Sequence, residues 1–430
     1  MTKISHIENM STNFSDRMIC KPLITSMTHR CRHCNSPLYH EIIDLGHQPP
    51  SNAYKTAKQL LSKEVAYPLK VYLCSQCWLI QLPAHAAAED LFTADYAYFS
   101  STSESWCSHA KRFVAEAAER LELGTNSMVV EIASNDGYLL QYIQERGIPC
   151  MGIEPTHATA LAAREKGINT LEGFFGVELA EQLEAADLVV ANNVIAHVPD
   201  INDFMAGISR LLKPAGLASI EFPHVMRLLQ GNQFDTIYHE HYSYLSLHVV
   251  QRIATSAGLT VIDVEELATH GGSLRLWLTH TSIVEQSSAI TAVLAAEKRA
   301  GLETIDTYAD LQLRAEATKH DLLEFLLSAK RKGKKILGYG AAAKGNTLLN
   351  YCGIKPDLLS AVADKAPSKQ GKYLPGSHIP VIKPEEMIAL RPDALLVLPW
   401  NIIGELQTQL ANQVLVTAIP SLQTWPTSSP

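Results

Sequence analysis

The chain has 430 residues, 47% of them apolar and 19% charged, and a formal net charge of −8 at pH 7. This length and composition are typical of a globular protein with two or three domains, each long enough to bury its own core. A net negative charge argues against a broad phosphate-backbone footprint, so we expect no nucleic acid among its partners.

The N-terminal segment, MTKISHIENMSTNFSDRMIC, has no apolar run long enough for a signal peptide. The most apolar later stretch, DALLVLPWNIIGEL, is interrupted by Pro399 and Asn401, which argues against a membrane-spanning helix. We therefore expect a cytoplasmic protein with no membrane partner.

Two CxxC pairs, Cys31 with Cys34 and Cys74 with Cys77, account for half of the eight cysteines. Such pairs are the usual way to close a tetrahedral Cys₄ zinc site, and a complete thiolate shell predicts a structural metal. The 39 residues between the pairs include HEIIDLG and YPLKVYLC, which we predict to be β-structure. The alternatives are two chance pairs of buried cysteines, or a nucleic-acid zinc ribbon, which would need basic residues around the pairs.

The next segment, LFTADYAYFSSTSESWCSHAKRFVAEAAERLEL, predicts an aromatic, hydroxyl-rich turn that leads into an amphipathic helix. Tyr96 and Tyr98 lie in the turn. They either line a pocket or pack at the rim of the fold with their hydroxyls in water.

From Met128 onward short apolar strands alternate with helices, a pattern that predicts a parallel sheet with helices on both faces. Ligands of such sheets bind at the carboxyl ends of the strands. Asp136 and Gly137 offer a tight turn at a helix N-terminus, and Glu154 ends the second strand, where a carboxylate accepts bonds from ribose hydroxyls.

These features predict a nucleoside cofactor. The loop EIASNDGYL has few glycines for the approach of a pyrophosphate, as NAD would require, whereas S-adenosylmethionine has no phosphates. The candidate cofactor-binding residues are Glu131, Ser134, Asn135, Asp136, Gly137, Glu154, Asn192 and Asn193.

In the C-terminal third, KKILGYGAAAKGNTLLN predicts a strand, a glycine-bearing turn and a helix. Exposed amides from Gly340 to Ala343 would suit a phosphate, with Lys344 as the counter-charge. The lysines after Asp364 suit a pyrophosphate-contacting loop or, alternatively, a solvated turn. The candidate substrate-binding residues are Gly340, Ala341, Lys344, Asp364 and Lys369.

Taken together, the motifs resemble those of the sugar C-methyltransferases, which methylate a ring carbon of dTDP-4-keto-deoxysugars. The resemblance runs from about Cys31 to Pro420. It is carried by the two CxxC pairs and by DLGHQPPSNAY, VEIASNDGYLL, AHVPDINDF, EFPHVMRLLQGNQFDTIYHEHYSYLS, THGGSLR and GYGAAAKGNT.

The resemblance implies an α/β protein in three parts. A small zinc-binding domain is followed by a Rossmann-like S-adenosylmethionine methyltransferase domain and by a C-terminal Rossmann-like domain that helps to hold a sugar nucleotide. The expected bounds are a flexible tail over residues 1–27, the zinc-binding domain over 28–90, the methyltransferase domain with its leading helix over 91–285, and a helical linker with the C-terminal domain over 286–430.

The segment YHEHYSY, residues 238–244, is the richest in chemical groups. Methylation of a carbon beside a ketone requires a base for the α-proton and donors for the enolate. The resemblance implies that His241, rather than His239, is the base, and Glu240 or a neighbouring carboxylate is available to fix its tautomer. The candidate catalytic residues are His241, His197, Tyr238, Glu240, Tyr96 and Tyr98.

In this reading His197 donates to the C4 oxygen of the sugar, and the tyrosines supply further donors. Either histidine is alternatively a structural residue with satisfied hydrogen bonds. We expect methylation at C3 of a dTDP-linked keto sugar. The alternatives are methylation at C5, an NAD-dependent sugar-nucleotide oxidoreductase, and a non-catalytic zinc-ribbon binding protein. The sequence sets no oligomeric state, and a monomer is one option.

Overall fold

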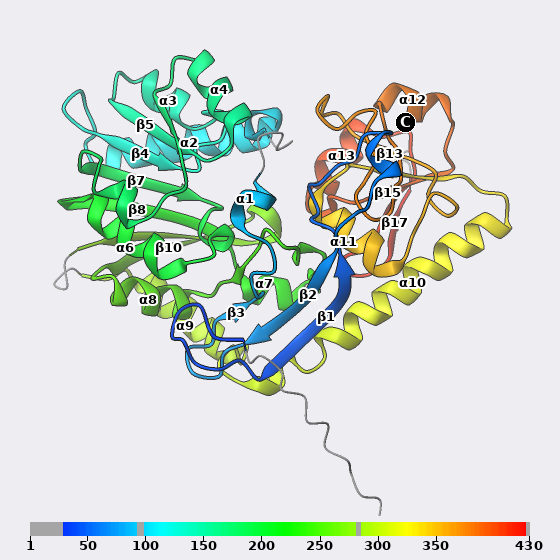
Figure 1. Cartoon of the computed structure of the whole chain (residues 1–430), viewed down its shortest axis with the longest axis horizontal. Helices are drawn as coiled ribbons and strands as arrows, with labels where there is room; N and C mark the ends of the chain where they lie inside the picture. Colours follow the sequence, from blue (N-terminus) through cyan, green and yellow to red (C-terminus); the bar gives the residue numbers. More distant parts are fainter. Residues whose placement is uncertain (1–28, 93–98, 281–284, 427–430) are drawn as a thin grey trace, which may run out of the picture.

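The computed structural model describes residues 29–92, 99–280 and 285–426. The expected N-terminal tail, Tyr96 and Tyr98 lie outside these residues. The described strands form three sheets. In Figure 1 the second and third sheets form two lobes, and the long strands of the first sheet run between them.

The first sheet is antiparallel and has the strand order β1-β2-β3-β9. The strands are β1 (His40–Gln48), β2 (Tyr67–Leu73), β3 (Ile80–Gln81) and β9 (Ser243–Tyr244). The strands predicted between the CxxC pairs are confirmed as β1 and β2. Strand β9 belongs to the segment YHEHYSY, residues 238–244, so this distant part of the chain completes the first sheet, which the sequence did not predict.

The second sheet has seven strands in the order β10-β11-β8-β7-β4-β5-β6. Pairing from β8 to β6 is parallel, and β11 and β10 add antiparallel strands at one edge. The strands are β4 (Val129–Ile132), β5 (Cys150–Glu154), β6 (Thr170–Glu172), β7 (Ala186–Asn192), β8 (Leu212–Pro223), β10 (Thr260–Leu267) and β11 (Ser273–Thr279).

Helices cover both faces of this sheet, as the pattern predicted (Figure 1). Because both faces are covered, β4 is buried along its whole length. One face carries α2 (Glu104–Arg120), α3 (Leu140–Gln144) and α4 (His157–Glu165). The other carries α5 (Val177–Ala180), α6 (Ile201–Leu211), α8 (Leu247–Ser256) and α9 (Ser288–Arg299).

The third sheet has the order β14-β13-β12-β15-β16-β17, parallel except for β17. The strands are β12 (Ile336–Tyr339), β13 (Val362–Ala363), β14 (Val381–Ile382), β15 (Ala394–Val397), β16 (Leu415–Thr417) and β17 (Gln423–Trp425). The remaining α-helices of the described chain are α1 (Ala88–Leu91), α7 (Val225–Gln230), α10 (Leu311–Arg331), α11 (Ala343–Cys352), α12 (Pro384–Ala389) and α13 (Ile403–Gln409).

The first and third sheets share one apolar core. Side chains of β1 and β2, such as Ile43 and Leu69, belong to the same buried cluster as Leu322 of α10 and Leu348 of α11. This sharing fixes the zinc-binding domain against the C-terminal domain. No helix within the described residues is long and apolar enough to cross a membrane.

Candidate active site and metal centre

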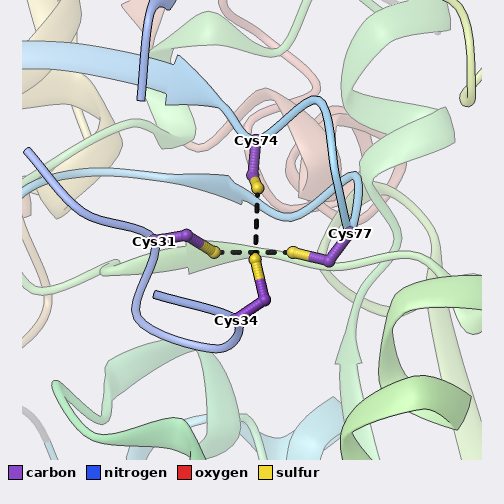
Figure 2. A group of neighbouring side chains, drawn as sticks. All are labelled: Cys31, Cys34, Cys74 and Cys77. Carbon is purple, nitrogen blue, oxygen red and sulfur yellow. Dashed lines mark hydrogen bonds between the residues drawn. The ribbon is translucent and has the colours of Figure 1, made fainter. Parts of the chain in front are cut away.

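The four CxxC cysteines converge on one point. Their sulfur atoms all lie within 4.8 Å of one another, and Figure 2 shows them directed inward from two separate loops. Each loop closes in the same way, because the amide of Asn35 donates to Cys31 and that of Trp78 to Cys74. Four converging thiolates are a complete tetrahedral ligand set, so these residues fit zinc.

The surroundings of the cluster suit a structural metal. Cys31, Cys74 and Cys77 are buried in the core that also holds α6 and α8, which cover the second sheet. The Nε2 group of Gln81 donates to the sulfur of Cys31 at 3.1 Å, a supporting contact outside the ligand set. Zinc at this position would fasten the two loops to each other and to the central domain.

A cavity of about 540 Å³ lies where the three parts of the chain meet. Its lining includes residues at the carboxyl ends of β5 and β7, Asn52 of the zinc-binding domain, and the segment 342–344 of the C-terminal domain. The cofactor and substrate candidates therefore face one shared space. The predicted residues that line it are Asn135, Glu154, Asn192, Asn193, His197, Tyr238, His241, Lys344 and Lys369.

Glu154 ends β5 with its carboxylate held in place. The backbone amides of Asn135 and Thr156 each donate to it at 2.9 Å. Burial raises the pKa of Glu154, although these bonds oppose the shift. Within the described part of the chain, neither amide atom of Asn192 has a hydrogen-bond partner, although both are buried. A fixed carboxylate and an unsatisfied amide at one edge of the sheet suit a nucleoside cofactor with polar groups.

Four other cofactor candidates do not line the described cavity. They are Glu131, Ser134, Asp136 and Gly137. Gly137 has φ +74°, and a Cβ there would lie 2.3 Å from Ile168. The Asp136 carboxylate binds the hydroxyl of Ser101 and the ammonium of Lys166. The predicted tight turn before a helix is present, since the amide of Gly137 donates to the carbonyl of Ser134, and α3 begins three residues later, at Leu140.

The other two of these four candidates, Glu131 and Ser134, are buried. Burial holds the pKa of Glu131 well above its ordinary value. The hydroxyl of Ser134 is buried without a hydrogen-bond partner in the described chain. Both residues are buried where β4 passes into the turn before α3.

His241 has a defined tautomer. Its Nδ1 lies 2.7 Å from the carbonyl oxygen of Thr236, which can only accept, so the proton is on Nδ1 and Nε2 keeps a lone pair. The sequence had suggested Glu240 or a neighbouring carboxylate for this task. Glu240 instead accepts a hydrogen bond from Asn52 at 2.6 Å. Burial lowers the pKa of His241 well below its ordinary value, which makes the ring neutral at pH 7.

Two further rings adjoin His241. The ring centroid of Tyr238 lies 3.9 Å away and that of His197 lies 4.6 Å away. Burial lowers the pKa of His197 to about 4. His239, by contrast, is turned toward the zinc-binding domain, with its Nε2 3.3 Å from the carbonyl oxygens of Tyr67 and Pro68. The two histidines of the motif therefore have different surroundings.

Two lysines of the C-terminal domain reach the cavity. Lys344 donates to Asn401 at 2.8 Å and lies over the ring of Trp400, 4.5 Å from its centroid. Lys369 donates to the carbonyl of Ala341 at 2.8 Å. Both lysines line the described cavity, in a chain whose net charge is negative.

The predicted phosphate cradle at residues 340–343 needs correction. The amides of Gly340, Ala341 and Ala342 already donate within the protein, to Ala363, to the Asp364 side chain and to Gly340 respectively. Asp364 also accepts from the amide of Ala366 at 2.8 Å, so it closes the turn around the strand ends. Of the predicted set, Lys344 and Lys369 contact the cavity, whereas Gly340, Ala341 and Asp364 shape the loop behind it.

Among the residues of the described cavity lining that sequence reasoning missed are Asn52, Trp106 and His270. Asn52 and His270 belong to the motifs DLGHQPPSNAY and THGGSLR, so a signal existed. These motifs did not indicate a role for either residue, because nothing in the local sequence shows that their loops face His197 and His241.

Three family models match successive parts of the chain. They are a putative zinc binding domain over residues 31–92, a methyltransferase domain over 105–264 and a C-methyltransferase C-terminal domain over 268–419. C-methyltransferase NovU of Streptomyces niveus is 33% identical over 381 residues, which cover 87% of this chain and 90% of NovU.

Solved structures resemble the chain more weakly. The PH0226 protein from Pyrococcus horikoshii OT3 is 15% identical with a TM-score of 0.36, over 43% of this chain and 94% of that one. Magnesium protoporphyrin IX methyltransferase from Synechocystis PCC 6803 is 14% identical with a TM-score of 0.34, over 41% and 83%. Because these scores are low, the assignment rests on the sequence matches.

The fold and the matches define an S-adenosylmethionine-dependent methyltransferase with a zinc-binding N-terminal domain. The chain belongs to the C-methyltransferase family that includes NovU.

We expect one zinc ion per chain by elemental analysis of the purified protein. Cys31→Ser or Cys77→Ser should lower the zinc content and the melting temperature, because ligand loss opens the metal shell and loosens two loops. Cys107→Ser, a half-buried cysteine outside the cluster, is the matched control and should retain the metal. A metal-free wild-type protein of unchanged stability would contradict the assignment.

Glu154→Ala should weaken the binding of S-adenosylhomocysteine by about 1–3 kcal/mol, because charge-assisted hydrogen bonds are lost. Isothermal titration calorimetry measures this directly. Glu172 pairs with Glu154 on the neighbouring strand but does not belong to the described cavity lining, so Glu172→Ala is the control. Equal affinities for the two variants would mean that the cofactor lies elsewhere.

Proposed function

We propose that this protein transfers a methyl group from S-adenosylmethionine to C3 of a dTDP-linked 4-keto-deoxysugar. The observation that carries the proposal is the state of His241: a neutral ring in the shared cavity whose Nδ1 proton is held by Thr236. Its Nε2 lone pair is thereby available as a general base for a proton beside a ketone.

In the proposed reaction the chain's own groups perform the proton chemistry. His241 Nε2 takes the proton from C3, and the electron pair of that bond moves toward the C4 carbonyl oxygen. Tyr238 is close enough to His241 to offer its hydroxyl to the sugar. His197 lines the same cavity, with its ring centroid 4.6 Å from that of His241, and is proposed to donate to the C4 oxygen. Bound S-adenosylmethionine supplies an electrophilic methyl group.

The nucleotide part of the substrate is proposed to lie toward the C-terminal domain. Lys344 and Lys369 give that side of the cavity two positive charges, which suits a diphosphate. Asn52 and Ala343, at the start of α11, also line the cavity. The name of NovU describes a C-methyltransferase, which supports the reaction type.

Methylation at C5 is the second candidate, because the same residues would serve if the sugar were turned about its ketone. An oxidoreductase has no support from the three family matches, none of which describes one.

The proposed function is tested by incubating the purified protein with S-adenosylmethionine and a panel of dTDP-4-keto sugars. Mass spectrometry should show the gain of one methyl group for at least one sugar. Failure with every 4-keto sugar, while cofactor binding is intact, would count against the substrate class.

His241→Asn should leave the fold and both ligand affinities intact and reduce turnover by about 10²–10⁴, the usual span for general acid–base catalysis. The asparagine amide occupies the place of Nδ1 and retains the bond to Thr236, so only the basic nitrogen is lost.

The sharper readout is solvent exchange without a methyl donor. With S-adenosylhomocysteine bound, wild type should incorporate deuterium at C3 of the keto sugar and the His241 variant should not. His239→Asn is the control and should exchange normally, since His239 faces the zinc-binding domain. Exchange at the wild-type rate in the His241 variant would give the base role to another group.

A further inference from the structure

The loop formed by the motif THGGSLR holds His270 in a strained conformation. His270 and Asn193 both have φ +54°, a left-handed conformation that costs energy in residues other than glycine. Both residues line the cavity, and Nδ2 of Asn193 lies 2.8 Å from Nε2 of His270. Strain of this kind persists where the surrounding structure imposes it, and it clusters at functional sites.

Contacts from three sides hold the loop. The Thr269 hydroxyl donates to the buried carboxylate of Glu221 at 2.9 Å. A Cβ on Gly271 would lie 2.7 Å from the ring of Trp400, and one on Gly272 would lie 2.6 Å from Arg227. The His270 ring itself meets Trp106 edge to face, with 4.9 Å between their centroids. The ring is thus fixed in position before any ligand binds.

The contact with Asn193 selects one tautomer. Because the Asn193 amide donates to Nε2, the ring proton is on Nδ1, the nitrogen that Asn193 does not engage. Burial lowers the pKa of His270 to about 4, so the ring is neutral at pH 7. A neutral imidazole N–H at a fixed position is an effective electrophile toward a carbonyl oxygen.

The ring nitrogens of His197 have different surroundings from those of His270. The His197 ring forms a hydrogen bond with the backbone of Glu240 that raises its pKa, as donation from the ring does, while burial lowers it by more. Its Nδ1 atom is fully buried and has no hydrogen-bond partner among the described residues, so this nitrogen is not exposed in the cavity.

We propose that the Nδ1–H group of His270 donates a hydrogen bond to the substrate oxygen that takes up negative charge when His241 removes the α-proton. This inference rests on the proposed function and changes the donor from His197 to His270. The proton of the substrate passes to Nε2 of His241, the C–H electron pair becomes the enolate, and His270 keeps its own proton throughout. A positive charge on the His270 ring would lower the pKa of both His241 and His197. This mutual influence is consistent with three rings that lie around the same cavity.

The tautomer is measured first, by two-bond ¹H–¹⁵N correlation spectra of protein labelled at histidine. The His270 signals, assigned by their loss in a His270 variant, should have the pattern of a neutral ring protonated at Nδ1. A ring protonated at Nε2 would overturn the proposal.

Two substitutions then separate the donor role from the structural role. The amide of His270→Asn lies near the position of Nδ1 and can still donate to the substrate. The amide of His270→Gln lies near the position of Nε2, where it can keep the contact with Asn193 but cannot reach the substrate. We expect His270→Gln to reduce both deuterium exchange and methyl transfer by about 10²–10³, the usual loss for one oxyanion donor, and His270→Asn to retain most of both activities.

His378→Gln is the matched control for backbone strain. His378 also has a left-handed conformation, with φ +57°, but it pairs with Glu64 and is not part of the described cavity lining. This control should exchange at the wild-type rate, and all variants should bind S-adenosylhomocysteine like wild type.

Full exchange in His270→Gln would overturn the inference alone. Greater loss in His270→Asn than in His270→Gln would also overturn it, because the contact with Asn193 would then be what matters. Absence of exchange in wild type with every 4-keto sugar would overturn the proposed function, and this inference with it.

Discussion

The position of the histidine-rich segment, residues 232–245, depends on hydrogen bonds from all three parts of the chain. Its strand β9 pairs with β3 of the zinc-binding domain. Trp400 of the C-terminal domain donates to Asp235 at 2.8 Å, and Thr347 donates to the carbonyl of Ile237 at 2.9 Å. On the methyltransferase side, the amide of Tyr242 donates to Ala196, beside His197. The segment is therefore held by contacts with each of the three parts.

This arrangement gives the structural metal an indirect role at the cavity. Zinc would order the two CxxC loops, β3 follows the second loop directly, and β9 pairs with β3. The base proposed for the reaction lies two residues before β9. A change at the metal centre should therefore act on the position of His241, which matters because catalysis requires reacting groups to be held within a fraction of an ångström.

Burial between three domains also decides the charge states in the cavity. It lowers the pKa of His197 and His270 to about 4 and raises that of Asp235 to about 6, because low-dielectric surroundings disfavour the charged form. Lys344 has a lowered pKa for the same reason, although Asp235 opposes the shift. The outcome is a set of neutral imidazoles beside a lysine that keeps favourable contacts with Trp400 and Asn401. Neutral rings suit proton abstraction and hydrogen-bond donation at neutral pH.

The sequence by itself determined those features that depend on residue type and short spacing. Two CxxC pairs predict a metal site because each pair brings two thiolates together within one turn, and the alternation of strands and helices predicts the central sheet because both faces must be buried. Only the tertiary structure decided the tautomers of His241 and His270, which depend on the Thr236 carbonyl and the Asn193 amide. It also showed that the amides from Gly340 to Ala342 are already bonded and that Asp136 faces Ser101 and Lys166. The physical reason is that every residue carries a backbone donor or acceptor, so sequence cannot indicate which of them meets a given side chain until the chain has folded.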